Sequence, residues 1–423
     1  MGSPLDPLRL EYSNALPPLQ LVRQLAPAGA ATFAATFVGP AGWARDPERR
    51  EGTARLVAQL LPTAAGTLRR VALARRLDRI GATLTSRSSP ESGEVTVWGS
   101  EADRKKLLGL LAEAVLRPRF DPDDIERIRR SLSERQLREL RQPAGRADRE
   151  LLAAVFPRAH PYRSTGLGTR ASLDRISRSD LIRFHRRHYV ADGGLLVVTT
   201  GSRSDRVERD ARRVFRGLSD RGPDPLVVPA LPRRAPRNVR VHLPGRAQVE
   251  VRVGGPSITQ DSPRYPAAYL ANQLLGGRPL LNRLFQRVRE RGGLAYGTSS
   301  HLETMRWGGF WTASAGTGPE RWPTVVRMLE REIDRVRDRP VPGPELDVIR
   351  ESAIGEIPLS LEETSDAHEL AVDAAYHGMP ADFWLTWPAR LRAVRPREVR
   401  EAAELAFDRN ASATVVAGPL RRA

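Results

Sequence analysis

The sequence predicts an α+β protein built of two homologous α/β halves. Short apolar runs alternate with longer segments whose apolar residues recur at helical spacing. The pattern of the first half returns in the second, since residues 195–198 (LLVV) correspond to residues 413–416 (ATVV) at an offset of 218. A second correspondence, between residues 77–82 and 289–294, has an offset of 212. Offsets of this size indicate a duplicated domain, because solenoid repeats are much shorter.

The first half is expected to open with strands and then to alternate helices with a hairpin. Gly39 and Pro40 end the second strand, and Gly81 stops the second helix, because glycine accepts the left-handed conformation of a helix end. Asp121 is expected to cap the helix that starts at Pro122. The elements expected in order are strands at 19–25 and 31–38, helices at 53–61 and 71–80, a hairpin at 83–85 and 94–98, helices at 102–115, from 122 and at 181–188, and a buried strand at 195–200.

A proline-rich stretch separates the two halves. It carries prolines at positions 223, 225, 229, 232 and 236. Such a stretch is extended and semi-rigid, which is typical of a linker between domains. We therefore predict a first half at residues 1–221, a linker at 222–236 and a second half at 237–423.

The net charge of +18 suggests, as one alternative, that the protein binds a nucleic acid. Lys105 and Lys106 are the only lysines, so arginine replaces lysine along the whole chain rather than on one binding face. The arginines are also interleaved with acids, as at residues 330–335 (EREIDR), a pattern typical of solvated helix faces. We therefore expect no nucleic-acid partner.

The sequence also bears on compartment and membrane association. No apolar run reaches the ~18 residues that span a bilayer, so we expect no membrane span. Residues 1–7 lack a basic segment followed by an apolar one, so we expect no signal peptide there. The chain has no cysteine, which excludes disulfides and thiolate metal sites. Both a cytoplasmic chain and an exported chain whose leader has been removed fit these observations.

Histidine pairs on predicted helices raise the alternative of a metal site. His185 and His188 lie three residues apart, and His368 and His377 lie nine apart. Arginines separate the first pair, and the nearest downstream acid falls beyond the end of its helix. We expect solvated helix faces in both cases.

Several segments resemble the pitrilysin/insulinase family of inverted-zincin metallopeptidases, which includes the mitochondrial processing peptidase. The most specific are residues 281–284 (LNRL) and 289–296 (RERGGLAY) in the second half. The first half contributes residues 52–61 (GTARLVAQLL), 120–122 (FDP) and 160–162 (HPY). The resemblance covers nearly the whole chain. It implies two similar α/β halves, each a sheet with helices on one side, that face each other like a clamshell.

The zinc motif of that family is missing from this sequence. The resemblance implies His-x-x-Glu-His at positions where this chain has Arg55, Ala58 and Gln59. Arg135 aligns with a further glutamate ligand. Arginine has no lone pair to donate and stays protonated, and two guanidiniums near one site repel a divalent cation. We therefore expect no zinc or other cofactor in this chain and no peptidase activity from the chain alone.

The resemblance further implies a role in a pair of subunits. Some bacterial members of the family pair a zinc-bearing subunit with one that has lost the motif but keeps an arginine and a tyrosine in its second half. Arg289 and Tyr296 match those two positions. We predict a non-catalytic subunit of a heterodimeric zinc peptidase, with zinc in a homologous partner subunit and a peptide as substrate. Arg289 and Tyr296 are the predicted catalytic and substrate-binding residues, and His301 is a further substrate-binding candidate.

Two alternatives from other functional classes remain. One is a peptidase-derived scaffold protein without a catalytic role. The other is a basic nucleic-acid-binding protein. The presence of Arg289 and Tyr296 weighs against the first, and the interleaved charges weigh against the second.

Overall fold

The structure is a computed structural model that describes residues 8–27, 30–202, 204–231 and 237–420. These residues fall into two compact units. Unit 1 draws on Met1–Gln136, Thr165–Val227 and Ile357–Thr386, and unit 2 draws on Leu137–Ser164, Val228–Glu356 and Trp387–Ala423. Each unit therefore contains segments from both halves of the sequence.

Unit 1 is built on a six-stranded sheet. Its strands are β1 (Leu10–Leu16), β2 (Leu19–Leu25), β3 (Thr32–Gly39), β4 (Thr83–Ser88), β5 (Gly93–Ser100) and β6 (Leu195–Thr200). They lie in the order β1-β2-β6-β3-β5-β4, with β2 and β6 parallel and the other neighbours antiparallel. All six residues of β6 are buried, which confirms the buried strand expected there and suits a central strand rich in β-branched residues.

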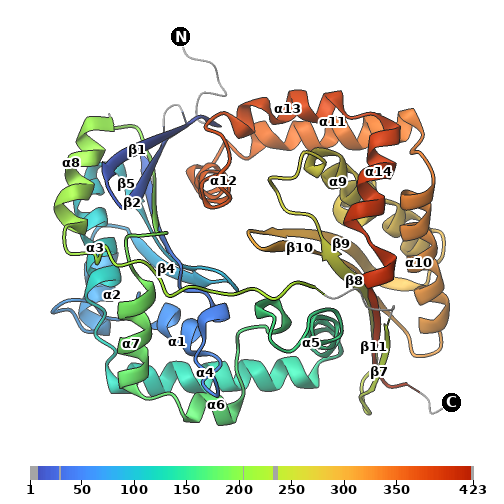
Figure 1. The fold of residues 1–423 in the computed structure, drawn as a ribbon, viewed down its shortest axis with the longest axis horizontal. Coiled ribbons are helices and arrows are strands. Elements are labelled where there is room, and N and C mark those ends of the chain that lie inside the picture. Colours follow the sequence, from blue (N-terminus) through green and yellow to red (C-terminus); the bar gives the residue numbers. More distant parts are fainter. Residues whose placement is uncertain (1–7, 28–29, 203, 232–236, 421–423) are drawn as a thin grey trace. The chain divides into compact units, whose positions relative to one another are not determined.

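Helices lie on both faces of this sheet. The helices of unit 1 are α1 (Thr53–Leu60), α2 (Arg70–Asp78), α3 (Arg104–Leu116), most of α4 (Pro122–Arg141), α6 (Arg170–Asp174), α7 (Arg178–His188), α8 (Ser204–Phe215) and α12 (Thr364–Tyr376). Helix α4 belongs to unit 1 as far as Gln136 and to unit 2 from Leu137. Helices α1, α3, α7 and α8 share one apolar core with Phe33 and Phe37 of β3. Helix α12 packs on the opposite face, against β3 and β6 (Figure 1).

Unit 2 is built on a five-stranded sheet. Its strands are β7 (Arg237–His242), β8 (Val249–Ser257), β9 (Ala295–Met305), β10 (Gly308–Thr317) and β11 (Ala413–Gly418). Its helical segments are α5 (Pro143–Val155), α9 (Tyr265–Asn272), the π-helical segments η5 (Gln273–Gly277) and η6 (Phe285–Glu290), α10 (Trp322–Asp338), most of α11 (Gly343–Leu359), most of α13 (Phe383–Ala393) and α14 (Pro396–Ala406). The end of α11, from Ile357, and the start of α13, up to Thr386, belong to unit 1. Helix α5 covers one face of the sheet, and α9, α10 and α14 cover the other (Figure 1).

The two sheets share one topology. The order β2-β6-β3-β5-β4 in unit 1 matches β7-β11-β8-β10-β9 in unit 2, and the single parallel pair occupies the same place in both. The prediction of two homologous α/β halves is thereby confirmed. One pair of helices is exchanged, because α5 from the first half of the sequence belongs to unit 2 and α12 from the second half belongs to unit 1.

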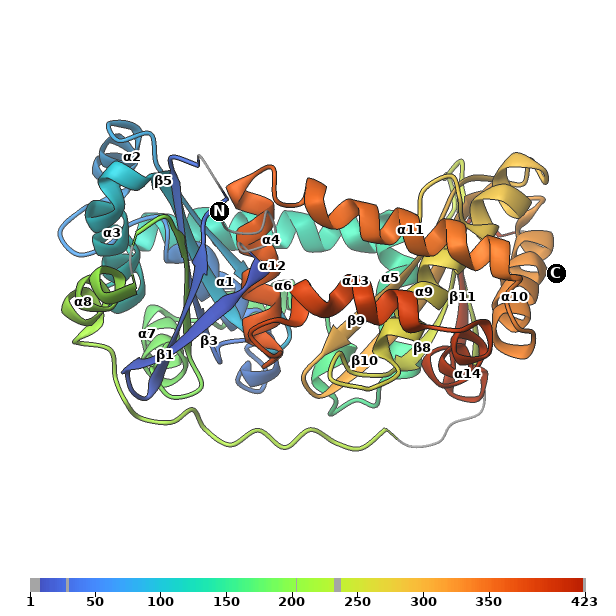
Figure 2. The ribbon, with the colours of Figure 1, turned by 90° about the horizontal axis from the view of Figure 1, so that it is seen from above.

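The predicted linker follows α8. Residues 219–231 form neither helix nor strand and take an extended course (Figure 2). Residues 232–236, the remainder of the predicted linker, lie outside the described residues. Within the described part of the chain, no helix is long and apolar enough to cross a membrane.

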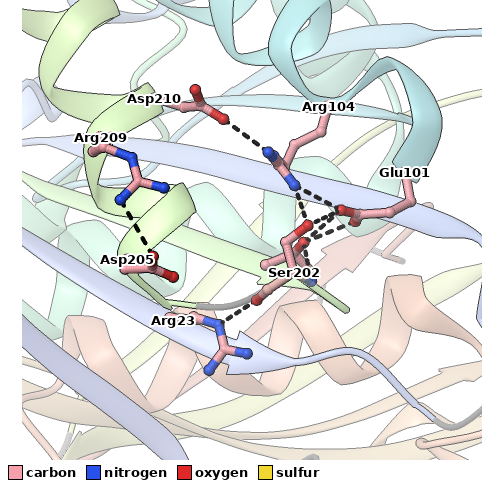
Figure 3. Close-up of polar contacts among 8 residues, drawn as sticks. Arg23, Glu101, Arg104, Ser202, Asp205, Arg209 and Asp210 are labelled. Carbon is pink, nitrogen blue, oxygen red and sulfur yellow. Dashed lines mark hydrogen bonds and ion pairs between the residues drawn. The ribbon is translucent and has the colours of Figure 1, made fainter.

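A cluster of polar side chains connects α3, α8 and the end of β6 in unit 1 (Figure 3). The Glu101 carboxylate, just before α3, accepts hydrogen bonds from Thr200 at the end of β6 (2.8 and 2.9 Å) and from Ser202 (2.7 Å). Arg104 in α3 pairs with the same carboxylate at 3.2 Å and with Asp210 of α8 at 2.8 Å. The cluster therefore fixes the starts of α3 and α8 to one end of the sheet.

Candidate functional site

The positions at which the resemblance implies the zinc motif lie on α1, and a carboxylate accepts hydrogen bonds from the backbone at the start of this helix. Gly52 precedes the helix with φ 100°, a conformation that favours glycine. Asp46 accepts hydrogen bonds from the backbone N–H groups of Gly52 (2.6 Å) and Ala54 (2.7 Å). Burial raises the pKa of Asp46 to about 7, although these two hydrogen bonds oppose the rise.

Arg55 is engaged in packing within unit 1. Its guanidinium lies 4.8 Å from the centre of the Trp43 ring, a cation–π contact, and its Nη2 donates to the Thr165 carbonyl at 2.9 Å. Ala58 is buried with 1% of its surface exposed, and Gln59 is half-buried. The three positions at which the resemblance implies two imidazoles and a general base thus carry a fixed cation, a methyl group and a neutral amide.

Arg135 lies on the exposed side of α4. The buried side of that helix carries Ile128, Leu132 and Gln136, and Arg135 lies off this register. Among the described residues, no group of three or more histidine and acidic side chains is arranged to hold a metal ion. The residues present at the zinc-motif positions also fail to fit zinc by their chemistry, because they offer no imidazole or carboxylate donor.

Arg289 lies on the π-helical segment η6 of unit 2. Leu280 has φ 63° and lies before this helical segment, which is π-helical over Phe285–Glu290. A glycine follows the end of this segment, since Gly293 has φ 57° and donates its N–H to the Arg289 carbonyl at 3.0 Å. The Arg289 guanidinium is exposed and lies 5.0 Å from the centre of the Phe285 ring.

Tyr296 lies near the start of β9, which is the edge strand of its sheet. The register between β9 and β10 shifts there, since Gly297 pairs with Gly316 and Ala295 pairs with Thr317, which leaves Tyr296 in a β-bulge. The Tyr296 side chain is 68% exposed. Bulges reorient side chains at sheet edges, and Tyr296 is an exposed aromatic residue on such a bulge.

His301 lies further along β9 and is also exposed. It pairs with Thr312 of β10, and its neighbour Ser300 is buried against Asn272 through a 2.8 Å hydrogen bond. His301 therefore points away from the face that α9 covers, because successive side chains alternate along a strand. Within the described residues, no hydrogen bond or ring contact joins Arg289, Tyr296 and His301 to one another.

Three histidines expected on solvated helix faces are buried, so that expectation was wrong. His185 bonds the Val115 carbonyl through Nε2 at 2.7 Å. His368 on α12 is 1% exposed, and its two ring nitrogens contact the hydroxyls of Thr36 (2.8 Å) and Thr199 (2.7 Å). Burial lowers the pKa of His185 and His188 to about 4 and that of His368 to about 3. Sequence reasoning missed the site of His368 because its partners lie in strands more than one hundred residues away.

Comparisons with known proteins agree with this fold. Residues 28–169 match the family described as Insulinase (Peptidase family M16), and residues 175–352 match the Peptidase M16 inactive domain. An uncharacterized zinc protease of Streptomyces coelicolor is 31% identical over 60% of this chain and 56% of its own length, so the match spans little more than half of that relative. An uncharacterized zinc protease of Mycobacterium bovis is 26% identical over 74% of this chain and 72% of its own length.

Solved structures extend the match to nearly the whole chain. A peptidase M16 inactive domain from Pseudomonas fluorescens superposes with a TM-score of 0.91 at 20% identity, covering 97% of this chain and 98% of its own. A protease from Helicobacter pylori superposes with a TM-score of 0.89 at 18% identity, covering 97% and 99%. These likenesses show the shared fold. With the two family matches, they show that the chain belongs to the insulinase, or M16, family of peptidases.

Proposed function

We propose that this chain is the non-catalytic subunit of a heterodimeric zinc peptidase. In this pair, a homologous subunit carries the zinc and the general base. The present chain supplies Arg289 and Tyr296, which bind the peptide and stabilise the transition state. The whole active site is therefore composite, and neither subunit hydrolyses peptides alone.

The observation that carries the proposal is the state of Arg55. Its guanidinium is held by the Trp43 ring and by the Thr165 carbonyl, at the position where the family motif has its first zinc-binding histidine. A cation so engaged contributes to packing and excludes a second cation from its surroundings. This supports a subunit in which the residue at the metal-ligand position contributes to packing and no longer binds a metal ion.

The geometry around Arg289 and Tyr296 supports the second part of the proposal. Both side chains are exposed, and they flank the left-handed turn at Gly293. The guanidinium offers a planar set of donors for peptide carbonyls, and the phenol offers a neutral O–H donor for an oxyanion. β9 is also an edge strand, whose free backbone groups can pair with an extended peptide.

The test is reconstitution with a homologous subunit that carries His-x-x-Glu-His. Each chain is assayed alone and then mixed, with an internally quenched peptide as substrate. We expect turnover only from the mixture, together with a shift to the heterodimer mass in size-exclusion chromatography. Full activity of the zinc-bearing subunit alone, unchanged on mixing, would contradict the proposal.

Arg289 is tested beside a matched neighbour. Arg289→Ala in the pair is expected to raise KM, because the variant loses donors to substrate carbonyls. Arg291→Ala is the control, since Arg291 is also exposed and lies only two residues away. A mixture that forms the heterodimer and is active, but whose activity is unaffected by both substitutions, would favour the alternative in which this chain is only a scaffold.

A further inference from the structure

A cavity of about 830 Å³ lies in unit 1, among the helices that pack on the Phe33 and Phe37 side of its sheet. Helices α2, α3 and α8 line this cavity, together with residues 65–68, which precede α2. Figure 1 and Figure 2 show α3 between the other two helices. The lining residues are distinct from those of the candidate functional site, so the proposed function does not account for this cavity.

The charged residues of this cavity are almost all cations. Its lining has a single acidic residue, Glu113, which is partly buried. It also has five basic residues, all of them exposed, which are Arg76 of α2, Lys105, Lys106 and Arg117 of α3, and Arg213 of α8. Both signs alternate at residues 330–335, whereas one sign dominates here. This cavity, called the basic cavity below, therefore has a positive electrostatic potential.

Three of these cations have no acidic partner in the described part of the chain. Lys106 pairs with Asp103 at 2.6 Å, and Arg117 pairs with Glu113 at 3.3 Å. Among the described residues, no ion pair or hydrogen bond involves the three remaining basic side chains, those of Arg76, Lys105 and Arg213. Three exposed cations from three helices are thus available to an anionic partner.

The basic cavity also has an apolar floor. Leu68, Leu116 and Val214 pack against the core of unit 1 and remain only partly buried. A small inorganic anion would leave these side chains in contact with water. A molecule with both acidic and apolar groups would cover them and pair with the cations at the same time. The lining therefore matches an acidic and amphipathic molecule.

Gly109 lines the basic cavity from the interior of α3. Glycine destabilises a helix interior relative to alanine. A Cβ atom at this position would meet no atom within 4 Å, so no packing in the described part of the chain requires a glycine here. A locally unfavourable residue that the fold does not need is typical of a functional position. The missing side chain leaves the backbone of α3 open to an approaching molecule.

The lysines of the chain give a further indication. Lys105 and Lys106 are the only two, and both lie in the first turn of α3, which contains no acidic residue. The helix dipole makes a cation unfavourable at this end of a helix. An anion bound beside this turn would offset that unfavourable interaction. Gly109 and the two lysines are thus locally unfavourable residues of one helix that line the same cavity.

We propose that the basic cavity binds an acidic amphipathic segment of a partner protein. The apolar side chains of the segment lie on the floor, its carboxylates pair with the three available cations, and it crosses α3 at Gly109. A protein segment suits the lining better than a nucleic acid, because the described lining has no aromatic side chain on which a base could stack. This binding is independent of the proposed peptidase role.

The probe is a fluorescently labelled peptide in which glutamate and leucine recur at helical spacing. It is added to the full-length wild-type chain and followed by fluorescence anisotropy. One control peptide has glutamine in place of each glutamate, and another has alanine in place of each leucine. We expect the probe to bind roughly tenfold or more tightly than either control. Equal binding by either control would overturn the proposal, as would absence of binding or tighter binding of a single-stranded oligonucleotide of the same charge.

A variant at Gly109 tests whether the peptide occupies the basic cavity. Gly109→Leu places a side chain on the floor and should weaken binding of the probe roughly tenfold or more. The thermal midpoint of this variant should equal or exceed that of the wild type, because leucine favours a helix interior and the position is open. Wild-type affinity in a folded Gly109→Leu variant would overturn the proposal.

A matched pair of double variants tests the cations. Lys105→Gln with Arg213→Gln should weaken binding of the probe roughly tenfold. Arg175→Gln with Arg186→Gln removes the same charge from two exposed arginines of unit 1 that do not line the basic cavity, and should leave binding nearly unchanged. Circular dichroism checks that each variant is folded, and the comparison of the three peptides needs no variant. An equal loss in both double variants would overturn the proposal.

Discussion

The guanidinium of Arg55 lies 4.8 Å from the centre of the Trp43 ring. The Trp43 ring also lies against Gly166, where a Cβ atom would come within 2.4 Å of it and where φ is 70°. Thr165, immediately before this glycine, accepts the hydrogen bond from Arg55. A tryptophan, a glycine turn and an arginine therefore pack together at a position where the resemblance implies a zinc ligand.

Restoring the motif is expected to fail. The triple variant Arg55→His, Ala58→Glu and Gln59→His supplies two imidazoles and a base, but Arg135 still aligns with the remaining acidic ligand. Ala58 is 1% exposed, so a glutamate there must also find room in a packed region. Elemental analysis of the purified variant should show well below one zinc per chain. One tightly bound zinc per chain, in the variant or in the wild type, would contradict this account of the site.

The polar cluster of unit 1 offers a stability test with an internal control (Figure 3). Arg104→Met leaves the partly buried carboxylates of Glu101 and Asp210 without their cation, and should cost about 2–4 kcal/mol of unfolding free energy. Arg209→Met breaks an exposed pair with Asp205 at 3.2 Å and should cost only about 0.3–0.5 kcal/mol. Urea titration measures both, and equal costs would show that burial does not govern these pairs.

The buried histidine of α12 predicts a loss of stability in acid. Burial holds the pKa of His368 at about 3, whereas the unfolded chain takes up this proton near pH 6.5. Its contribution is therefore complete above about pH 6.5 and is lost as the pH falls toward 3. His368→Leu should make the dependence shallower by about 1.4 kcal/mol per pH unit below pH 6. Unfolding free energies at about pH 5 and pH 6 test this, and an unchanged slope would contradict it.

The sequence predicts the local elements of this fold well. The strand at β6, helix α1 and the hairpin of β4 and β5 follow from periodicity and from glycine and proline positions, which act within a few residues. The exchange of α5 and α12 does not follow, because an amphipathic helix does not specify which sheet it covers. His368 illustrates the difference, since its partners Thr36 and Thr199 come from distant strands.

The sequence identifies the residues of the candidate site but does not predict their contacts or their backbone geometry. Residue types alone identify Arg55 and Ala58 as unfit for zinc. They do not show that Trp43 and the Thr165 carbonyl contact Arg55, because Trp43 and Thr165 lie more than one hundred residues apart in the sequence. Helical or strand periodicity likewise does not predict the π-helical geometry around Arg289 or the bulge at Tyr296.

The central claim is that this chain contributes chemistry to a partner's active site, and Tyr296→Phe tests it most directly. The variant keeps the ring and loses only the hydroxyl of a side chain that is 68% exposed, so assembly and thermal stability should stay unchanged. Tyr12→Phe is the control, since Tyr12 is 37% exposed and its hydroxyl donates to the Met379 carbonyl within unit 1. In the reconstituted pair, Tyr296→Phe should lower kcat by ~10²–10³, the usual loss for one oxyanion donor, and Tyr12→Phe should leave kcat unchanged. Wild-type turnover by an assembled Tyr296→Phe pair would contradict the claim.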